Sequence, residues 1–213
     1  MFCYKNIIIE GNIGVGKTTL CKRLAKKHNA ILLLESFADN PFLPQFYKEP
    51  DKYAFTVEMA FLADRYTQLK RKIQEQDLFS DFIISDYYYM KSLIFAKQTL
   101  NDTEFQLYRQ FFNIIYNAMP KPDLYVYLHA DVARLMQNIK SRGRKYEQHI
   151  TEKYLLDIQH SYFEFFKEHR DSFPILILDI TSLDFVTNEA DFAHLEDAIL
   201  FSKYSEPITR LFF

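Results

Sequence analysis

Short apolar runs alternate along this chain with long stretches of helical character. Five of these runs are continuously apolar, which is typical of strands buried on both faces of a parallel sheet. They span Asn6–Ile9, Ala30–Leu34, Phe82–Ser85, Asp123–Leu128 and Pro174–Leu178. The pattern predicts a five-stranded parallel sheet.

The stretches between the runs predict helices. Residues 51–76 contain neither glycine nor proline, and Asn101 followed by Glu104 is a capping pattern. Strands that alternate with helices predict a doubly wound α/β fold, with helices flanking the sheet. The tail Ser205–Phe213 stays open, because it can dock on the body or on a partner. The predicted helices are Lys17–His28, Asp51–Gln76, Asp102–Ala118, Ala130–Ser141, Thr151–His169 and Ala190–Leu200.

Composition narrows the class of protein. The 213 residues, 48% hydrophobic and 25% charged, fit one soluble domain over residues 1–213. A net charge of −2 argues against nucleic-acid binding through a basic patch. No run approaches the roughly 20 apolar residues of a membrane span, and no segment has the form of a secretion signal. Cys3 and Cys21 predict two reduced thiols, so we expect a cytoplasmic protein without a membrane partner.

Three of the four glycines lie in one phosphate-binding pattern directly after the first predicted strand. The pattern G-x-x-x-x-G-K-[ST] matches residues 11–18. Glycine lets successive backbone N–H groups point at phosphate oxygens, and the helix beginning near Lys17 adds its positive end. Lys17 is expected to reach the β- and γ-phosphates, and the Thr18 hydroxyl to bind Mg²⁺. The predicted nucleotide-binding residues are Gly11, Asn12, Ile13, Gly14, Val15, Gly16, Lys17, Thr18 and Thr19.

Carboxylates follow the second and third predicted strands. Glu35 ends one run, and Asp86 ends the other in a Walker-B-like arrangement. Ligands of open α/β sheets bind beyond the carboxyl ends of the strands. One carboxylate can therefore bind Mg²⁺, the role we assign to Asp86, while the other accepts a proton from an attacking hydroxyl. Alone, each also fits a solvated strand end.

Two further groups of charged residues stand out. Arg142 and Arg144 flank Gly143, which suits a mobile arginine-rich lid on a transferring phosphoryl group, although a solvated basic helix end fits too. Glu58 and Arg65 lie seven residues apart and share a helix face. They fit a ligand site or a buried ion pair without a ligand.

With these motifs the chain resembles the deoxyribonucleoside kinase family over nearly its whole length, including bacterial members and the kinase domains of Bacteroidetes proteins. Residues 10–19 look like its phosphate loop. Glu35 with residues 39–43 and 46–47 resembles the segment of its catalytic base. Residues 142–148 match its lid pattern R-G-R-x-x-E-Q.

The resemblance implies a P-loop kinase fold, a lid over about 142–150, a homodimer, and ATP with Mg²⁺ in deoxynucleoside salvage. Glu35 would be the general base on the sugar 5′-hydroxyl. Tyr47 and Glu147 would hold the 3′-hydroxyl, and Arg65 would stand at the base pocket. Lys17, Arg142 and Arg144 would act on the phosphate.

The chain also departs from this pattern. The family usually has arginine after the acid of the third strand, and here Tyr87 follows Asp86. Ser92 stands where many members have an acid, Glu58 where they often have glutamine, and Asn138 at a lid position that is often arginine. Lys91 could replace some of the lost charge, without the fork geometry of arginine.

These observations predict ATP-dependent phosphorylation of a deoxyribonucleoside 5′-hydroxyl. A purine, chiefly deoxyguanosine, is favoured, because an ionised Glu58 only accepts hydrogen bonds and guanine presents two adjacent donors. One alternative is a kinase for a nucleoside monophosphate or a pterin-like molecule. The other is a non-catalytic nucleotide-binding module, which the missing arginine favours and the intact Lys17, Glu35 and Asp86 oppose.

Overall fold

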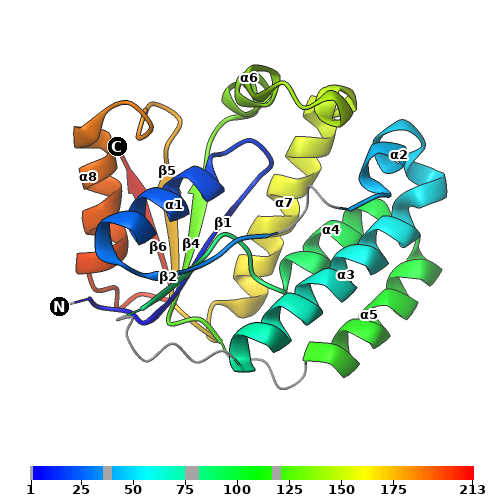
Figure 1. The fold of residues 1–213 in the computed structure, drawn as a ribbon, viewed down its shortest axis with the longest axis horizontal. Coiled ribbons are helices and arrows are strands. Elements are labelled where there is room, and N and C mark those ends of the chain that lie inside the picture. The colour runs from blue at the N-terminus through cyan, green and yellow to red at the C-terminus, as the bar shows by residue number, and fades with distance from the viewer. Residues whose placement is uncertain (1, 36–39, 75–81, 117–120) are drawn as a thin grey trace.

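A six-stranded sheet forms the centre of the protein. The computed structural model describes residues 2–35, 40–74, 82–116 and 121–213. The strand order is β2-β3-β1-β4-β5-β6, and all neighbours pair in parallel (Figure 1). The strands are β1 Asn6–Gly11, β2 Ile31–Leu33, β3 Ile83–Ser85, β4 Leu124–His129, β5 Ile175–Asp179 and β6 Ile208–Phe212. The α/β class and the five predicted strands are confirmed, each strand end to within two residues.

Helices cover both faces of the sheet, and several extend beyond it as a helical lobe (Figure 1). Helices α1 and α8 lie on one side, and α3, α4, α5 and α7 on the other. The helices are α1 Lys17–His28, α2 Leu43–Lys48, α3 Pro50–Gln74, α4 Lys91–Thr99, α5 Asp102–Tyr116, α6 Val132–Arg142, η2 Lys145–His149, α7 Glu152–His169, α8 Glu189–Glu196 and η3 Asp197–Phe201.

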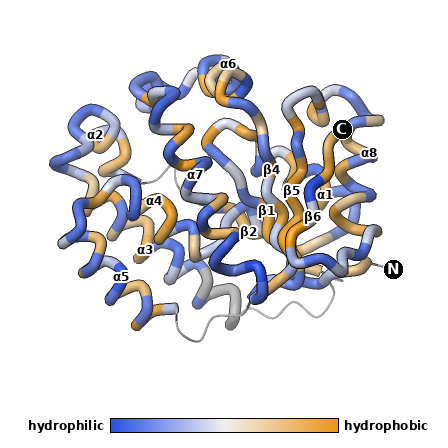
Figure 2. Tube along the Cα trace, turned by 180° about the vertical axis from the view of Figure 1, so that it is seen from behind, coloured by the Kyte–Doolittle hydropathy of each residue, from blue (hydrophilic) through white to orange (hydrophobic). Residues whose placement is uncertain are grey.

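The apolar runs of β1, β3, β4 and β5 are mostly buried, as their pattern predicts, whereas the edge strand β2 is only half-buried along Ile31–Leu33. Along β1, Ile7 and Ile9 pack in the core shared with α1 and α8, while Ile8 joins the core beneath α7. Figure 2 shows the central strands as mostly hydrophobic and the helices as mixed. A third core lies within the helical lobe, where helices α2, α3, α4 and α5 pack together. Its buried members include Leu62, Tyr108 and Phe112.

The predicted count of five strands is wrong. The tail left open by the sequence docks on the body: β6 pairs with β5, with Ile208 opposite Ile175 and Phe212 opposite Asp179. Polar Thr209 and Arg210 interrupt this strand, and it is only partly buried at the sheet edge, so it has no continuous apolar run. The sixth strand therefore carries a weaker sequence signal than the inner strands.

Helices α2, α4 and η2 were missed, and other helix ends shift. These three helices have only six, nine and five residues, so the window that shows helical periodicity is short. Helix α3 ends at Gln74 and α5 at Tyr116, and the predicted continuations 75–76 and 117–118 lie outside the described residues. None of the helices in the described ranges combines the length and apolar character needed to cross a bilayer.

Candidate active site

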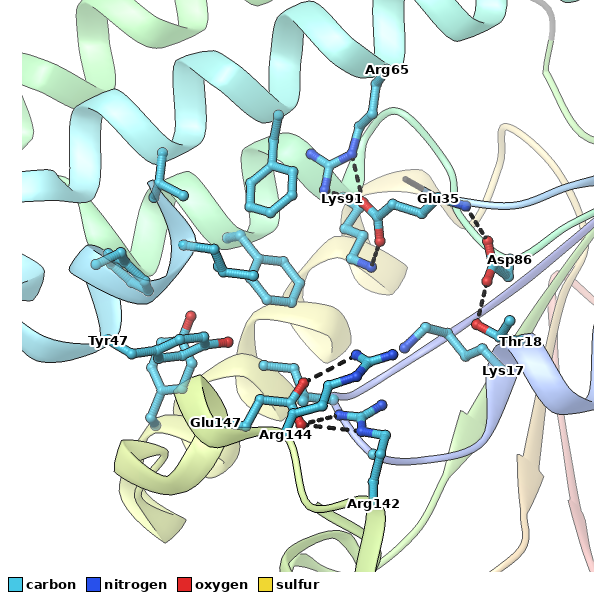
Figure 3. A pocket seen from close by; sticks show the side chains of 18 of the residues that line it. Lys17, Thr18, Glu35, Tyr47, Arg65, Asp86, Lys91, Arg142, Arg144 and Glu147 are labelled. Carbon is cyan, nitrogen blue, oxygen red and sulfur yellow. Dashed lines mark hydrogen bonds and ion pairs between the residues drawn. The ribbon is translucent and has the colours of Figure 1, made fainter. Parts of the chain in front are cut away.

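A cavity of about 310 Å³ opens between the phosphate loop and the helical lobe (Figure 3). It lies at the carboxyl edge of the sheet, where a parallel fold gathers its strand ends. The structure thus brings together residues predicted from distant parts of the chain. The predicted site residues on its wall are Ile13, Gly14, Gly16, Lys17, Thr18, Thr19, Glu35, Tyr47, Glu58, Arg65, Asp86, Arg142, Arg144 and Glu147.

Three predicted nucleotide-binding residues lie off this wall. Val15 lines a neighbouring cavity of about 350 Å³, beside Gly14 and Gly16. Gly11 and Asn12 line neither of these two cavities. Asn12 is buried, and its side-chain amide donates to the Leu155 carbonyl at 2.8 Å. This contact ties the loop to α7.

The phosphate loop needs its glycines because of its backbone shape. Gly14 and Gly16 have φ of 83° and 101°, which L side chains rarely adopt. A Cβ at Gly14 would also lie 2.8 Å from Ile139 Cγ1 and 3.0 Å from the Leu135 carbonyl oxygen. Helix α1 begins directly after Gly16, so its positive end faces the cavity.

Lys17 folds back over the loop. Its ammonium donates to the carbonyls of Gly11 and Asn12 at 2.8 and 2.9 Å. Burial, together with the nearby Lys91, lowers the pKa of Lys17 to about 8. A phosphate group here would favour the charged ammonium.

Thr18 and Asp86 form an oxygen-rich pair beside the loop. The Thr18 hydroxyl donates to Asp86 Oδ2 at 2.5 Å, and the Glu35 backbone N–H donates to Asp86 Oδ1 at 2.7 Å. Burial raises the pKa of Asp86. A hydroxyl next to a carboxylate suits a hard cation such as Mg²⁺. Within the described ranges no three His, Cys, Asp or Glu residues group as a metal site.

Glu35 is held by two cations from two helices. Arg65 Nε and Nη2 both donate to Oε1, the Nε contact at 2.8 Å, and Lys91 Nζ donates to Oε2 at 2.8 Å (Figure 3). Burial raises the pKa of Glu35, but Lys91 and Arg65 outweigh it and hold that pKa well below its usual range. The carboxylate is therefore ionised at neutral pH and fixed at both oxygens.

The pairing of Arg65 differs from one interpretation of the sequence. Arg65 and Glu58 share a face of α3, which fitted an ion pair between them. Instead, Arg65 binds Glu35, and its Nη1 donates to Ser92 Oγ at 2.6 Å. Ser92, at a position where many family members have an acid, thus anchors this guanidinium.

The two carboxyl oxygens of Glu58 differ in their surroundings. Its side chain lines the cavity, and the residue is 3% exposed. Thr99 donates to Oε1 at 3.1 Å, whereas the buried Oε2 has no hydrogen-bond partner among the described residues. Burial raises the pKa of Glu58 to about 7. A buried, unpartnered acceptor on a cavity wall is costly unless a ligand satisfies it.

The arginine pair binds the buried Glu147, while the side chains of Arg142 and Arg144 stay 34% and 30% exposed. Arg142 Nη2 and Nε donate to Glu147 Oε2 at 2.6 and 3.1 Å, and Arg144 Nη1 to Oε1 at 3.3 Å. Gly143 ends α6 with φ of 68°. Nearby, the Tyr47 ring lies nearly parallel to Tyr146, with ring centroids 6.2 Å apart.

Sequence reasoning gave no individual role to several residues on the cavity wall or just behind it. Glu10 is fully buried and accepts from the Tyr88 N–H at 2.8 Å and the Tyr162 hydroxyl at 3.0 Å. It lies near the carboxyl end of a strand, and that signal could have found it. Phe61, Phe95 and Tyr154 line the cavity, and apolar periodicity alone marks them only as core.

Asn138 and Asp39 also belong to the motifs compared with the family. The Asn138 amide donates to the Gly14 carbonyl at 3.0 Å, so it supports the phosphate loop. Asp39, part of the segment compared with the family's base motif, lies outside the described residues.

Comparison with known proteins agrees with this arrangement. The model of the deoxynucleoside kinase family matches residues 7–201. A deoxyguanosine kinase from Bacillus subtilis is 34% identical over 201 residues, covering 91% of this chain and 97% of that relative. A deoxyadenosine kinase from Lactobacillus acidophilus is 30% identical over 190 residues, covering 85% and 88%. The solved structure of a deoxyadenosine kinase from M. mycoides with bound dATP has a TM-score of 0.77 and 27% identity, covering 92% of this chain and 98% of that one. The chain therefore belongs to the deoxynucleoside kinase family, whose members are phosphotransferases.

Proposed function

We propose that this protein transfers the γ-phosphoryl group of ATP to the 5′-hydroxyl of a deoxynucleoside, with deoxyguanosine preferred. One observation carries the reaction type: the ionised Glu35 lies on the wall of a cavity that the phosphate loop also lines. A hydroxyl placed there meets a proton acceptor and the phosphate site together.

Residues on the loop side hold the phosphates. The loop N–H groups, the start of α1 and Lys17 bind the β- and γ-phosphates. The contact between Thr18 and Asp86 supports a Mg²⁺ site at these two residues, and the ion would neutralise phosphate charge. Arg142 and Arg144 clamp the transferring group, as residues 142–150 close about Gly143.

Residues on the acceptor side orient the nucleoside. Tyr47 and Glu147 bind the sugar 3′-hydroxyl, and Arg65 lies at the base pocket. Glu35 takes the proton of the 5′-hydroxyl while that oxygen bonds to the γ-phosphorus and the bond to the β-phosphate oxygen breaks. Glu35 is ionised, so its oxygens can accept that proton, and the two cations fix its orientation while lowering its basicity.

The unpartnered Oε2 of Glu58 supports the preference for guanine. Guanine presents N1–H and the 2-amino group side by side, and an ionised carboxylate can accept from both. Adenine and cytosine each pair one donor with one acceptor there, which suits an amide better than a carboxylate. The Bacillus subtilis relative named a deoxyguanosine kinase, 34% identical, agrees with this reading.

The experiment measures kcat/KM for the four deoxynucleosides with γ-labelled ATP, using the native protein and Glu58→Gln. We expect the native protein to favour deoxyguanosine, and Glu58→Gln to lower that preference by about tenfold or more, the effect of roughly 1–3 kcal/mol for a mismatched buried polar group. A Thr67→Val variant, changed at an exposed hydroxyl of the same helix, is the matched control.

Other outcomes separate the alternatives. Label transferred only to deoxynucleoside monophosphates or a pterin would identify another acceptor. No transfer to any acceptor, with ATP still bound, would identify a non-catalytic module. A native preference for thymidine or deoxycytidine would remove Glu58 as the reader of the base.

We further propose that the chain is a single cytoplasmic domain that forms a homodimer. Cys3 and Cys21 are free, in keeping with a reducing compartment.

Leu107, Phe111 and Ile114 form an apolar stripe on α5 and are 44%, 41% and 79% exposed, which supports a contact between two copies. Sedimentation of native protein and Ile114→Glu tests this: a native monomer would contradict the dimer.

A further inference from the structure

The first turn of α4 organises the charged groups around Glu35. Lys91 and Ser92 are adjacent there, and both are buried, 6% and 0% exposed. Lys91 binds Glu35 directly, and Ser92 accepts from Arg65, which binds the other oxygen of Glu35. Two neighbouring residues of one helix therefore fix this carboxylate. Lys91 is one of its two cations, and Ser92 holds the other, Arg65.

We infer that Lys91 is a positioning residue for phosphoryl transfer, which holds the Glu35 carboxylate in the orientation that faces the acceptor hydroxyl. The inference rests on the proposed function, in which Glu35 is the base. It gives Lys91 a role through Glu35 and not as a binder of nucleotide.

Geometry distinguishes Lys91 from the other cation. Arg65 takes Oε1 and Lys91 takes Oε2, and they approach the carboxylate from different sides (Figure 3). With Arg65 alone, the carboxylate can still turn about the bond to its carbon chain. The second contact, at 2.8 Å, removes that freedom. A displacement of about 1 Å at a reacting group can cost about 10²-fold in rate.

The surroundings of Lys91 also favour a functional role. Its ammonium lies 3.9 Å from Glu10 Oε2, so it sits between two buried carboxylates. A buried ion pair is a weak source of stability, since desolvation offsets most of the attraction. The cavity wall includes Lys91, which places the Glu35–Lys91 contact where an acceptor binds.

The test is a double-mutant cycle of Lys91→Met and Glu35→Gln, with kcat and KM measured for deoxyguanosine and ATP. We expect Lys91→Met to lower kcat by about 10²-fold, with KM for ATP changed less than threefold. In the Glu35→Gln background the same change should lower kcat by less than threefold, because Lys91 acts through Glu35. Lys91→Arg should recover at least tenfold of the loss.

Lys97→Met is the matched control, since Lys97 is exposed on the same helix and should keep native kcat. If Lys91→Met does not fold, Glu10→Gln with Lys91→Met removes the carboxylate left without its cation and serves instead. Full activity of the folded Lys91 variant, or equal losses in both backgrounds, would contradict the inference.

Failure of the proposed function can be distinguished from failure of the inference about Lys91. A native protein that phosphorylates no deoxynucleoside contradicts that function, and the inference is then decided by crystal structures of native protein and Lys91→Met. A turned Glu35 carboxylate in the variant supports the positioning role, and an unchanged one contradicts it.

Discussion

Arg65 reaches Glu35 from α3 instead of pairing with Glu58, seven residues before it on the same helix. This choice of partner has two consequences. Glu35 stays ionised beside two cations, and Glu58 keeps a buried oxygen to which no residue of the described ranges donates a hydrogen bond. The cavity wall therefore holds one ionised carboxylate fixed by two cations, Glu35, and one buried carboxyl with a raised pKa, Glu58.

Activity toward deoxyguanosine should depend on the ionisation of Glu58. Its pKa of about 7 means that the acceptor-only carboxylate prevails above pH 7 and the protonated acid below it. We expect kcat/KM for deoxyguanosine to fall as pH drops through 7, and kcat/KM for deoxyadenosine to fall less, because the acid offers one donor and one acceptor. Profiles for both substrates check this, and Glu58→Gln should lose the difference between them.

The same residue should make stability depend on pH. The folded pKa of Glu58 is raised above its ordinary value of 4.5, so the folded state binds a proton that the unfolded chain releases. The free energy of unfolding should therefore decline as pH rises from about 4.5 to 7. Glu58→Gln should stabilise the protein at pH 8 by on the order of 2 kcal/mol. Urea unfolding at pH 5 and pH 8 measures this, and equal stabilities of native protein and variant at pH 8 would count against it.

Glu35→Gln should lower kcat by roughly 10²–10⁴-fold, the usual loss for a general base. The amide still fills the space between Arg65 and Lys91, so nucleotide binding should change little. Steady-state kinetics with calorimetric titration of ATP separates the two effects. Near-native turnover of the variant would show that Glu35 is not the general base.

Arg144→Ala should lower kcat and kcat/KM together, because the clamp acts in the transition state. Arg144 Nη1 donates to Glu147 Oε1 at 3.3 Å, and the guanidinium has further N–H donors for a phosphate. The variant is compared with Lys145→Ala, changed at an exposed neighbour. A rise in KM for ATP alone would assign Arg144 to ground-state binding.

Local sequence pattern was enough to predict the inner strands, the phosphate loop and the position of two carboxylates. The inner strands are continuous apolar runs because both their faces are buried, and the phosphate loop is encoded by the spacing of Gly11, Gly16 and Lys17. Glu35 and Asp86 were identifiable because parallel strands deliver their ends to one edge. The pattern over residues 142–148 marked Arg142 and Arg144, which line the cavity, and their action as a lid stays a prediction.

Tertiary structure decided the sixth strand and the partners of Arg65 and Lys91. These features depend on contacts between elements that are distant in sequence. Strand β6 is half-buried at an edge, so only its pairing with β5 reveals it. The partner of Arg65 depends on how α3 packs over Glu35, and helical spacing alone suggested Glu58. Lys91 meets Glu35 only because α4 begins beside the end of β2, a placement set by packing and not by local pattern.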